Sequence, residues 1–444
     1  MIRDFLLLLT VVGVATGARS FLPPDATVTG SGATLAFGFL LLAAFFTGRI
    51  FHALRLPHLT GFILCGAVLG PEIASVLTPG MLDDLTLVKR VAVSLIALMA
   101  GCELNLRALR SRAKEIGAQA LGGLFVAAIL LFAFLYQILP WLPWTAGLTG
   151  GERAAVALVV ANVLCALSPA VVMGILSETR SAGPLSEASL SIVVLADLFI
   201  VLTFAGSSAI ADATFGGADG GGSVAGLVAH LGGSALAGLV LGAALTLYEL
   251  RVGRRTGLFV FASLFVVAEA GVPLHLDPLL VGLTAGLFVE NASPVSGHHL
   301  IRETEPAARP VFAVFFAVIG AEVHLHAFTA VAAFALAAAA VRAAGIYVGA
   351  RLGARVVGVP ATLARLVPYG MFPQAGIALA LANLLAESPH PWARGMATLV
   401  FGTILVNEMV GPVLFRNALV RAGEVGAKDA DTTVVEDEPT AEAG

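Results

Sequence analysis

Long apolar runs recur along the whole chain, separated by short stretches that contain Pro, Gly or charged residues. A helix needs about 20 apolar residues to cross a bilayer. Thirteen such runs follow the first segment, with centres near residues 42, 68, 97, 127, 164, 198, 236, 264, 285, 317, 342, 374 and 406. The pattern predicts an all-α polytopic membrane protein with 13–14 transmembrane helices.

The two ends of the chain differ from this membrane domain, which we place at residues 31–421. Residues 1–30 have a short basic start, an apolar run and small residues, which fits either a signal peptide or an extra N-terminal span. Both interpretations stay open. Residues 422–444 are acidic, hold one lysine, Lys428, and have too few apolar residues to fold. We predict a disordered acidic tail there.

The basic residues predict an orientation. Lys and Arg concentrate in alternate loops, for example at 107–114, 251–255 and 351–365, whereas the intervening loops hold few. Loops rich in Lys and Arg face the cytoplasm. The chain is therefore expected to be a multi-pass protein of the bacterial inner (plasma) membrane with a cytoplasmic C-terminus.

Composition narrows the class of protein. The chain is 58% hydrophobic and 12% charged, with mean hydropathy +0.94. Abundant Ala and Gly favour a closely packed helix bundle over a barrel. We find no zinc-protease, nucleophile-elbow or phosphate-loop motif, which disfavours an enzyme. No feature supports a cofactor or binding to nucleic acid.

A short internal repeat predicts symmetry. GCELNL at 101–106 recurs as GAEVHL at 320–325, each at the end of a span, and the two spans are seven apart. An odd offset places the two units in opposite directions across the membrane. Inverted repeats of this kind are typical of secondary transporters.

Asp197 is the most informative single residue. It lies near the middle of an apolar span, about ten apolar-rich residues from either end. A charged residue at the bilayer centre costs about 2.5–3.5 kcal/mol on insertion scales, so it indicates function by default. Burial favours the protonated form of a carboxyl group, and a bound cation favours the ionised form. One such group can therefore couple a proton to a cation.

Two spans carry proline near mid-membrane, at Pro169 and Pro373, and they are also seven spans apart. A break in lipid is tolerated only where its freed backbone groups face protein or water. Transporters place their ions at such breaks. Ser168, next to the first break, offers a hydroxyl oxygen suited to a hard cation, although most serines in membrane helices serve packing.

Two other buried charges accompany these features. Arg342 lies inside an apolar span and must have a partner, either the carbonyl ends at the breaks or Asp197. Structural anchoring and an active role are both open for it. Glu408, in ILVNEMVGP, could line the pathway, and we treat it as a second-tier candidate.

Seven stretches carry a family resemblance. They are RLPHLTGFILCGAVLGP, ALMAGCELNLRALRS, LSPAVVMGILSE, LADLFIVL, LDPLLVGLTAGL, FFAVIGAEVHL and MFPQAGIALALA. In this order they resemble the monovalent cation:proton antiporter superfamily, with the sodium/proton exchanger fold, from about residue 35 to 420. The resemblance implies two crossing discontinuous helices, a core subdomain, a dimerisation subdomain and a homodimer.

The resemblance also assigns residues. It implies that Asp197 is the ion-binding aspartate and that Arg342 is the buried basic residue. It places Ser168 and Pro169 at the crossing of the first broken helix, and Pro373 and Gln374 on the second break.

One departure from the family shapes the functional expectation. Electrogenic members have two adjacent aspartates, but here the first position is Ala196. We therefore expect electroneutral exchange of a monovalent cation, Na⁺ ahead of K⁺, for H⁺ by alternating access. The alternatives are a glutathione-gated-type potassium efflux or channel-like pathway, and a non-transporting sensor.

Overall fold

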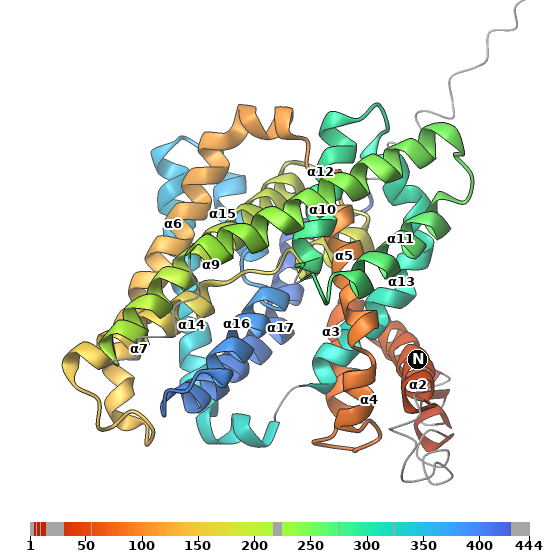
Figure 1. Ribbon diagram of the computed structural model, residues 1–444. Helices are drawn as coiled ribbons and strands as arrows, with labels where there is room; N and C mark the ends of the chain where they lie inside the picture. The colour runs from red at the N-terminus through yellow and green to blue at the C-terminus, as the bar shows by residue number, and fades with distance from the viewer. Residues whose placement is uncertain are drawn as a thin grey trace, which may run out of the picture.

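The computed structural model describes residues 4–5, 7–8, 10–14, 31–54, 56–215, 224–274, 276–322 and 325–427, and within these ranges it contains helices and no strands. Figure 1 labels the main helices. Their bounds are α2 (Ser31–Ala53), α3 (His58–Leu69), α4 (Pro79–Asp84), α5 (Thr86–Glu103), α6 (Leu106–Ile138), α7 (Gly150–Cys165), α8 (Pro169–Thr179), α9 (Pro184–Thr214), α10 (Val224–Arg251), α11 (Thr256–Ala270), α12 (Pro278–Ala292), α13 (Gly297–Ala321), α14 (Leu325–Val356), α15 (Ala361–Gly370), α16 (Gly376–Glu387) and α17 (Ala393–Ala422).

The predicted spans correspond to these helices. Each of the thirteen predicted centres falls within a helix or, for residue 374, between the two short helices α15 and α16. Among the described residues, six helical segments are long and apolar enough to cross a membrane, and shorter apolar helices accompany them. The all-α polytopic prediction is confirmed.

Local sequence explains where several helices begin. Thr78, Ser168 and Asp277 each precede a proline, and each side chain accepts a hydrogen bond from a backbone N–H in the first turn of the following helix. Proline suits the first helical position because its missing N–H would have no partner in the helix there. The polar side chain satisfies one of the remaining donors.

The helices form two groups in space, and each group consists of two separate blocks of the sequence (Figure 1). We call α6–α9 with α14–α17 the site bundle, and α2–α5 with α10–α13 the second bundle. Within each group the helices pack extensively, whereas the contacts between groups come mainly from α3 and α5 against α8 and α17. The division follows the sequence in blocks, as expected of a chain made of two repeats.

The two helices that end at the repeated motif, α5 and α13, lie side by side. Lys89, at the start of α5, forms an ion pair with Glu322, which directly follows α13. The beginning of one helix therefore lies against the end of the other, so α5 and α13 run in opposite directions. This arrangement agrees with repeated units that cross the membrane in opposite senses.

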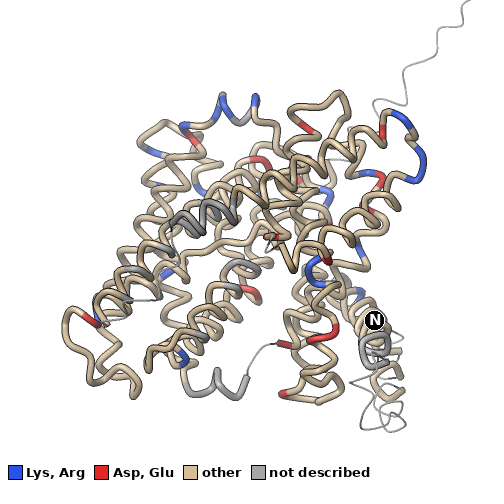
Figure 2. The backbone as a smooth tube through the Cα atoms, viewed as in Figure 1, with Lys and Arg blue, Asp and Glu red and all other residues tan. Residues whose placement is uncertain are grey.

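Lys and Arg gather at one end of the molecule. Figure 2 shows them concentrated along the upper edge of the view, where α6 begins and α10 ends. These segments belong to the loops that the charge pattern assigns to the cytoplasm. The alternation of basic loops along the sequence therefore corresponds to a separation in space.

Helix α17 is fixed to the start of α9 by a carboxylate. Glu424 accepts hydrogen bonds from the backbone N–H groups of Leu185 and Ser186, at 2.7 and 2.8 Å, and from the Ser186 hydroxyl at 2.7 Å. A negative charge is favourable at a helix N-terminus. Glu424 belongs to the segment predicted as an acidic tail, and the part of that tail beyond residue 427 lies outside the described residues.

Small residues allow close helix crossings inside both bundles. At the crossing of α6 and α14, a Cβ added to Gly122 would lie 2.5 Å from the carbonyl oxygen of Gly349. Gly117, in the same helix α6, has nothing within 4 Å of its added Cβ. The two glycines therefore have different roles, one in packing and one at an open position.

Gly122→Ala is expected to destabilise the protein, because the added methyl group must push two backbones apart at a cost of about 1–3 kcal/mol. Gly117→Ala is the matched control and should leave stability unchanged or raise it by up to about 1 kcal/mol, since alanine favours helix over glycine. Thermal unfolding of the purified variants in detergent measures both. Equal melting temperatures for the two variants would contradict the close packing of α6 on α14.

Candidate functional site

The first break separates α7 from α8. The chain is extended from Ala166 to Ser168, and α8 begins at Pro169. Ser168 is buried, and its Oγ accepts a hydrogen bond from the backbone N–H of Val171 at 3.2 Å. The hydroxyl predicted as a cation ligand therefore caps α8, and its oxygen retains capacity for a second interaction because a hydroxyl has two acceptor lone pairs.

The second break separates α15 from α16. The chain is not helical from about Met371 to Ala375, and Pro373 and Gln374 lie within this stretch. Both residues are buried. Proline at this position removes a backbone N–H and prevents a continuous helix. The two breaks predicted from the sequence are thus both present, with Pro169 at the start of α8 and Pro373 within the non-helical stretch between α15 and α16.

The side chain of Arg342, from α14, joins the two breaks. It is completely buried. Its Nε donates to Leu164 O at 2.7 Å, and its Nη2 donates to Ala166 O at 2.9 Å, both at the end of α7. Its Nη1 donates to Phe372 O at 2.8 Å and its Nη2 to Met371 O at 3.3 Å, both at the end of α15. One guanidinium group thus satisfies carbonyl oxygens of two helix ends.

This arrangement has a clear electrostatic basis. The last carbonyl groups of a helix have no partner within the helix and carry a partial negative charge. Two such ends approach each other here, and the fixed positive charge of Arg342 lies between them. Of the two candidate partners that the sequence offered for Arg342, the described contacts are with the carbonyl ends at the breaks.

A second set of hydrogen bonds supports the crossing. The Gln374 side chain donates from Nε2 to Leu164 O at 3.2 Å and to Val163 O at 3.4 Å. Its Oε1 accepts from Asn407 Nδ2 of α17 at 2.8 Å. Gln374 therefore links the second break to the first, and Asn407 fixes its amide orientation. Sequence reasoning missed Asn407, although its place beside Glu408 in an apolar stretch was a usable signal.

Asp197 lies in α9, and two contacts of its neighbours locate it relative to the breaks. Thr203, six residues later, donates to Asn162 of α7 at 3.3 Å. Ser189, eight residues earlier, lies against Gly370 at the end of α15. Six and eight residues correspond to about 9 and 12 Å along a helix. The α9 backbone at Asp197 therefore runs between the levels of the two half-helix ends.

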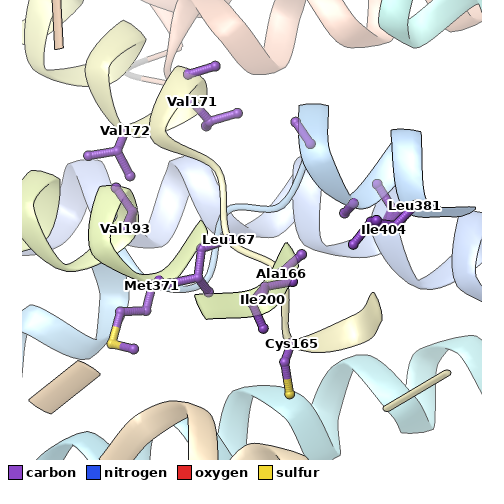
Figure 3. Packing of buried hydrophobic residues seen from close by; sticks show 14 of the residues in the cluster. Cys165, Ala166, Leu167, Val171, Val172, Val193, Ile200, Met371, Leu381 and Ile404 are labelled. Atoms are coloured by element: carbon purple, nitrogen blue, oxygen red, sulfur yellow. The ribbon is translucent and has the colours of Figure 1, made fainter. Parts of the chain in front are cut away.

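The surroundings of this stretch are apolar. Ala196 is buried, and so are Val193 and Ile200, one turn to either side of Asp197. Figure 3 shows Ile200 of α9 in the same packed region as Ala166 and Leu167 of the first break. No group of three or more His, Cys, Asp or Glu side chains that could hold a metal ion occurs among the described side chains.

The predicted residues thus fall into two sets. Ser168, Pro169, Pro373, Gln374 and Arg342 gather at the crossing of the two breaks. Glu408 lies one residue beyond Asn407, but it lines a cavity on another side of α17. The second-tier candidate Glu408 therefore lies beside the crossing, and among the described residues no hydrogen bond joins its side chain to the two breaks.

Broken helices that meet around a buried charge, in a bundle of membrane-spanning helices, are typical of secondary transporters with discontinuous helices. The sequence profile described as "Sodium/hydrogen exchanger, transmembrane" matches residues 40–420. The chain belongs to this family, whose members exchange cations for protons.

Solved structures show the same fold. The sodium proton antiporter MjNhaP1 from Methanocaldococcus jannaschii at pH 8 is 14% identical, with a TM-score of 0.64 over 89% of this chain and 99% of that one. An electron-microscopy structure of the same antiporter gives a TM-score of 0.65 at 14% identity, over 87% of this chain and 97% of that one. A comparison with curated proteins finds no match.

Arg342→Met is expected to destabilise the protein by about 3–5 kcal/mol, because it leaves several buried carbonyl oxygens without their charged donor. Arg342→Lys should cost less, since it keeps the charge but cannot form the fork of bonds to both breaks. Thermal unfolding of the purified protein measures the differences.

Arg351→Met is the matched control in the same helix, because the Arg351 guanidinium is only part-buried and donates to the Tyr347 hydroxyl at 3.2 Å. It should change the melting temperature little. If it lowered the melting temperature as much as Arg342→Met, the bridging role of Arg342 would be wrong.

Proposed function

We propose that this protein exchanges a monovalent cation, Na⁺ in preference to K⁺, for H⁺ by alternating access, with Asp197 as the carboxylate that binds either ion. The observation that carries the proposal is the course of α9, which takes residue 197 between the levels of two helix breaks. Ion sites of secondary transporters lie at such breaks near the bilayer midplane.

Charge explains why one carboxylate suffices for coupling. Arg342 already neutralises carbonyl oxygens at both helix C-termini. The N-termini of α8 and α16 also lie at the breaks, and helix N-termini favour negative charge. A carboxylate near these ends is stabilised when ionised. A bound Na⁺ or proton compensates its charge while the ion is carried across the membrane. Because the proton and the cation compete for the same oxygens, the site carries only one of them at a time.

Ser168 is the second proposed ligand. Its Oγ is buried at the first break and accepts one hydrogen bond, from Val171. A hydroxyl oxygen of this kind suits a hard cation, which prefers oxygen ligands. The set is small, so we propose that water completes the coordination of the ion.

Two bundles with limited mutual contact suit alternating access. We propose that the site bundle carries the ion and moves against the second bundle, which also forms a homodimer interface. Support comes from the packing, since both breaks, Arg342 and Asp197 belong to one bundle. A rigid unit that contains the whole site can move without dismantling it.

Asp197→Asn is expected to abolish exchange, because the amide cannot bind a proton or compensate a cation. In proteoliposomes with an internal pH indicator, a Na⁺ pulse should alter the internal pH for the wild-type protein and leave it unchanged for the variant. Glu187→Gln is the matched control on α9, because Glu187 is exposed and its nearest described ion-pair partner, Arg112, lies 3.6 Å away. It should transport like the wild type.

Exchange that survives in Asp197→Asn would refute this site. Flux without any coupled pH change would favour the potassium-efflux or channel-like alternative, and no flux of Na⁺, K⁺ or Li⁺ would favour the sensor. A series of these three cations across several pH values identifies the transported ion.

One carboxylate at the site also predicts the stoichiometry. With Ala196 beside Asp197, one proton should exchange for one cation, so transport moves no net charge. Currents on a solid-supported membrane after a Na⁺ jump should be absent for the wild type, although pH-coupled flux is present. Ala196→Asp adds a second protonatable group and is expected to produce a current. A wild-type current that matches the turnover rate would exclude electroneutral exchange.

A further inference from the structure

A cavity of about 290 Å³ lies between the two bundles. The second bundle contributes Lys89 at the start of α5, with Ile319 and Glu322 at the end of α13. The site bundle lines the other side with α16 and α17. The lining residues from these two helices are Leu379, Asn383, Phe401, Gly402, Ile404, Leu405 and Glu408.

The cavity runs from part-exposed charges to a buried one. The side chains of Lys89 and Glu322 are 25% and 38% exposed, and they form an ion pair with each other. Glu408, on α17, is only 1% exposed. At the opposite end of the bundles, Glu178 of α8 accepts a hydrogen bond from the backbone N–H of His58 at 2.8 Å, at the start of α3. The two bundles are therefore joined by a hydrogen bond at the end away from the cavity.

The carboxyl group of Glu408 lacks the partners that a purely structural residue would have. Its Oε1 is completely buried and has no hydrogen-bond partner among the described residues. A buried polar group without a partner costs about 1–3 kcal/mol. Glutamate is almost never fully buried unless it is paired. A cost of this size calls for a ligand or a proton at this position.

Its position in α17 connects the cavity to the breaks. Asn407, the preceding residue, bonds Gln374 on the second break. Gly411, three residues later, lies so close to Pro373 that its added Cβ would be 2.8 Å from the Pro373 nitrogen. Figure 3 shows Ile404 of α17 near Leu381 of α16, within the packed layer beside the crossing. Glu408 therefore stands between the cavity and the crossing.

We propose that Glu408 is a second ion-binding carboxylate, which holds a hydrated monovalent cation or a proton at the inner end of this cavity before it reaches Asp197. The proposal rests on the cation/proton exchange proposed above, and it adds a waiting site on the access path. The Asn383 side chain lines the same cavity and offers an amide oxygen as a further ligand.

The charge of the cavity fits this role. Among the described residues that line it, Lys89 and Glu322 are the only ionisable side chains besides Glu408. Their mutual ion pair largely compensates both charges, so Glu408 is left as the group that attracts a cation. A volume of about 290 Å³ accommodates a cation with several waters, since a single water needs only about 10–15 Å³ of such space.

The test measures binding without transport. Purified Asp197→Asn protein, which the proposed mechanism makes inactive, is mixed with NaCl in a weakly buffered solution that contains a pH indicator. A cation that displaces a proton from Glu408 should acidify the solution, whereas choline chloride at equal ionic strength should not. Asp197→Asn/Glu408→Gln is expected to lose this release, and Asp197→Asn/Glu408→Asp should retain it.

Thr403→Val, combined with Asp197→Asn, is the matched control. Thr403 is a buried polar residue of the same helix, its hydroxyl bonds Leu399 O at 2.8 Å, and it does not line the cavity. This control should release protons like Asp197→Asn alone. If Glu408→Gln fails to fold, Glu408→Leu serves instead, because removal of an unpartnered carboxyl group should not lower stability.

Transport supplies the second readout. With Asp197 intact, Glu408→Gln should raise the apparent KM for Na⁺ about tenfold, the effect of losing one ion contact of about 1.4 kcal/mol. Equal proton release with and without Glu408, or no release in Asp197→Asn protein, would overturn the inference. Absence of exchange in the wild type would refute the proposed function alone, because the binding experiment needs no transport.

Discussion

The hydrogen bonds from Arg342 to the ends of α7 and α15 are the constraint on which the rest of the site depends. Two helices stop inside the membrane, and each leaves carbonyl groups that lipid cannot satisfy. A single guanidinium group can serve both ends because its donors are fixed in a planar fork. Arg342 therefore determines how closely the two breaks approach, and the positions of Gln374 and Asn407 follow from that approach.

The same constraint explains the organisation of the site bundle. Arg342 reaches the breaks only if α14 packs closely along its neighbours, and Gly122 with Gly349 permits the close crossing of α6 and α14. A larger residue at these positions would displace the guanidinium from carbonyl oxygens that it contacts at 2.7–2.9 Å. The small residues set the distance between α6 and α14. At that distance the Arg342 side chain reaches the carbonyl oxygens of both breaks.

Much of this architecture was predictable from the sequence, and the remainder was not, for physical reasons. Apolar length indicated the spans. Pro169 and Pro373 indicated the breaks because proline lacks the backbone N–H that a helix interior uses. Other prolines are nevertheless accommodated inside helices, namely Pro306, Pro310 and Pro412. The need for a partner to Arg342 was evident, but its partners are backbone carbonyls, which leave no trace in a side-chain pattern. The cavity beside Glu408 depends on the rotation of α17. That helix is apolar on most sides, so its sequence does not reveal which side faces the second bundle.

The two carboxylates proposed to bind ions, Asp197 and Glu408, stand in different electrostatic surroundings. The α9 backbone at Asp197 runs between helix ends whose negative poles are already compensated by Arg342. Glu408 lies outside the contacts of that guanidinium and faces a cavity whose other charges pair with each other. Two successive sites with different surroundings allow an ion to lose water in stages, since each stage replaces only some of its hydration by protein oxygens. The donors of Arg342 between the two breaks are already bonded to carbonyl oxygens, so we propose that an ion leaves the cavity by movement of the site bundle and not through a conducting pore.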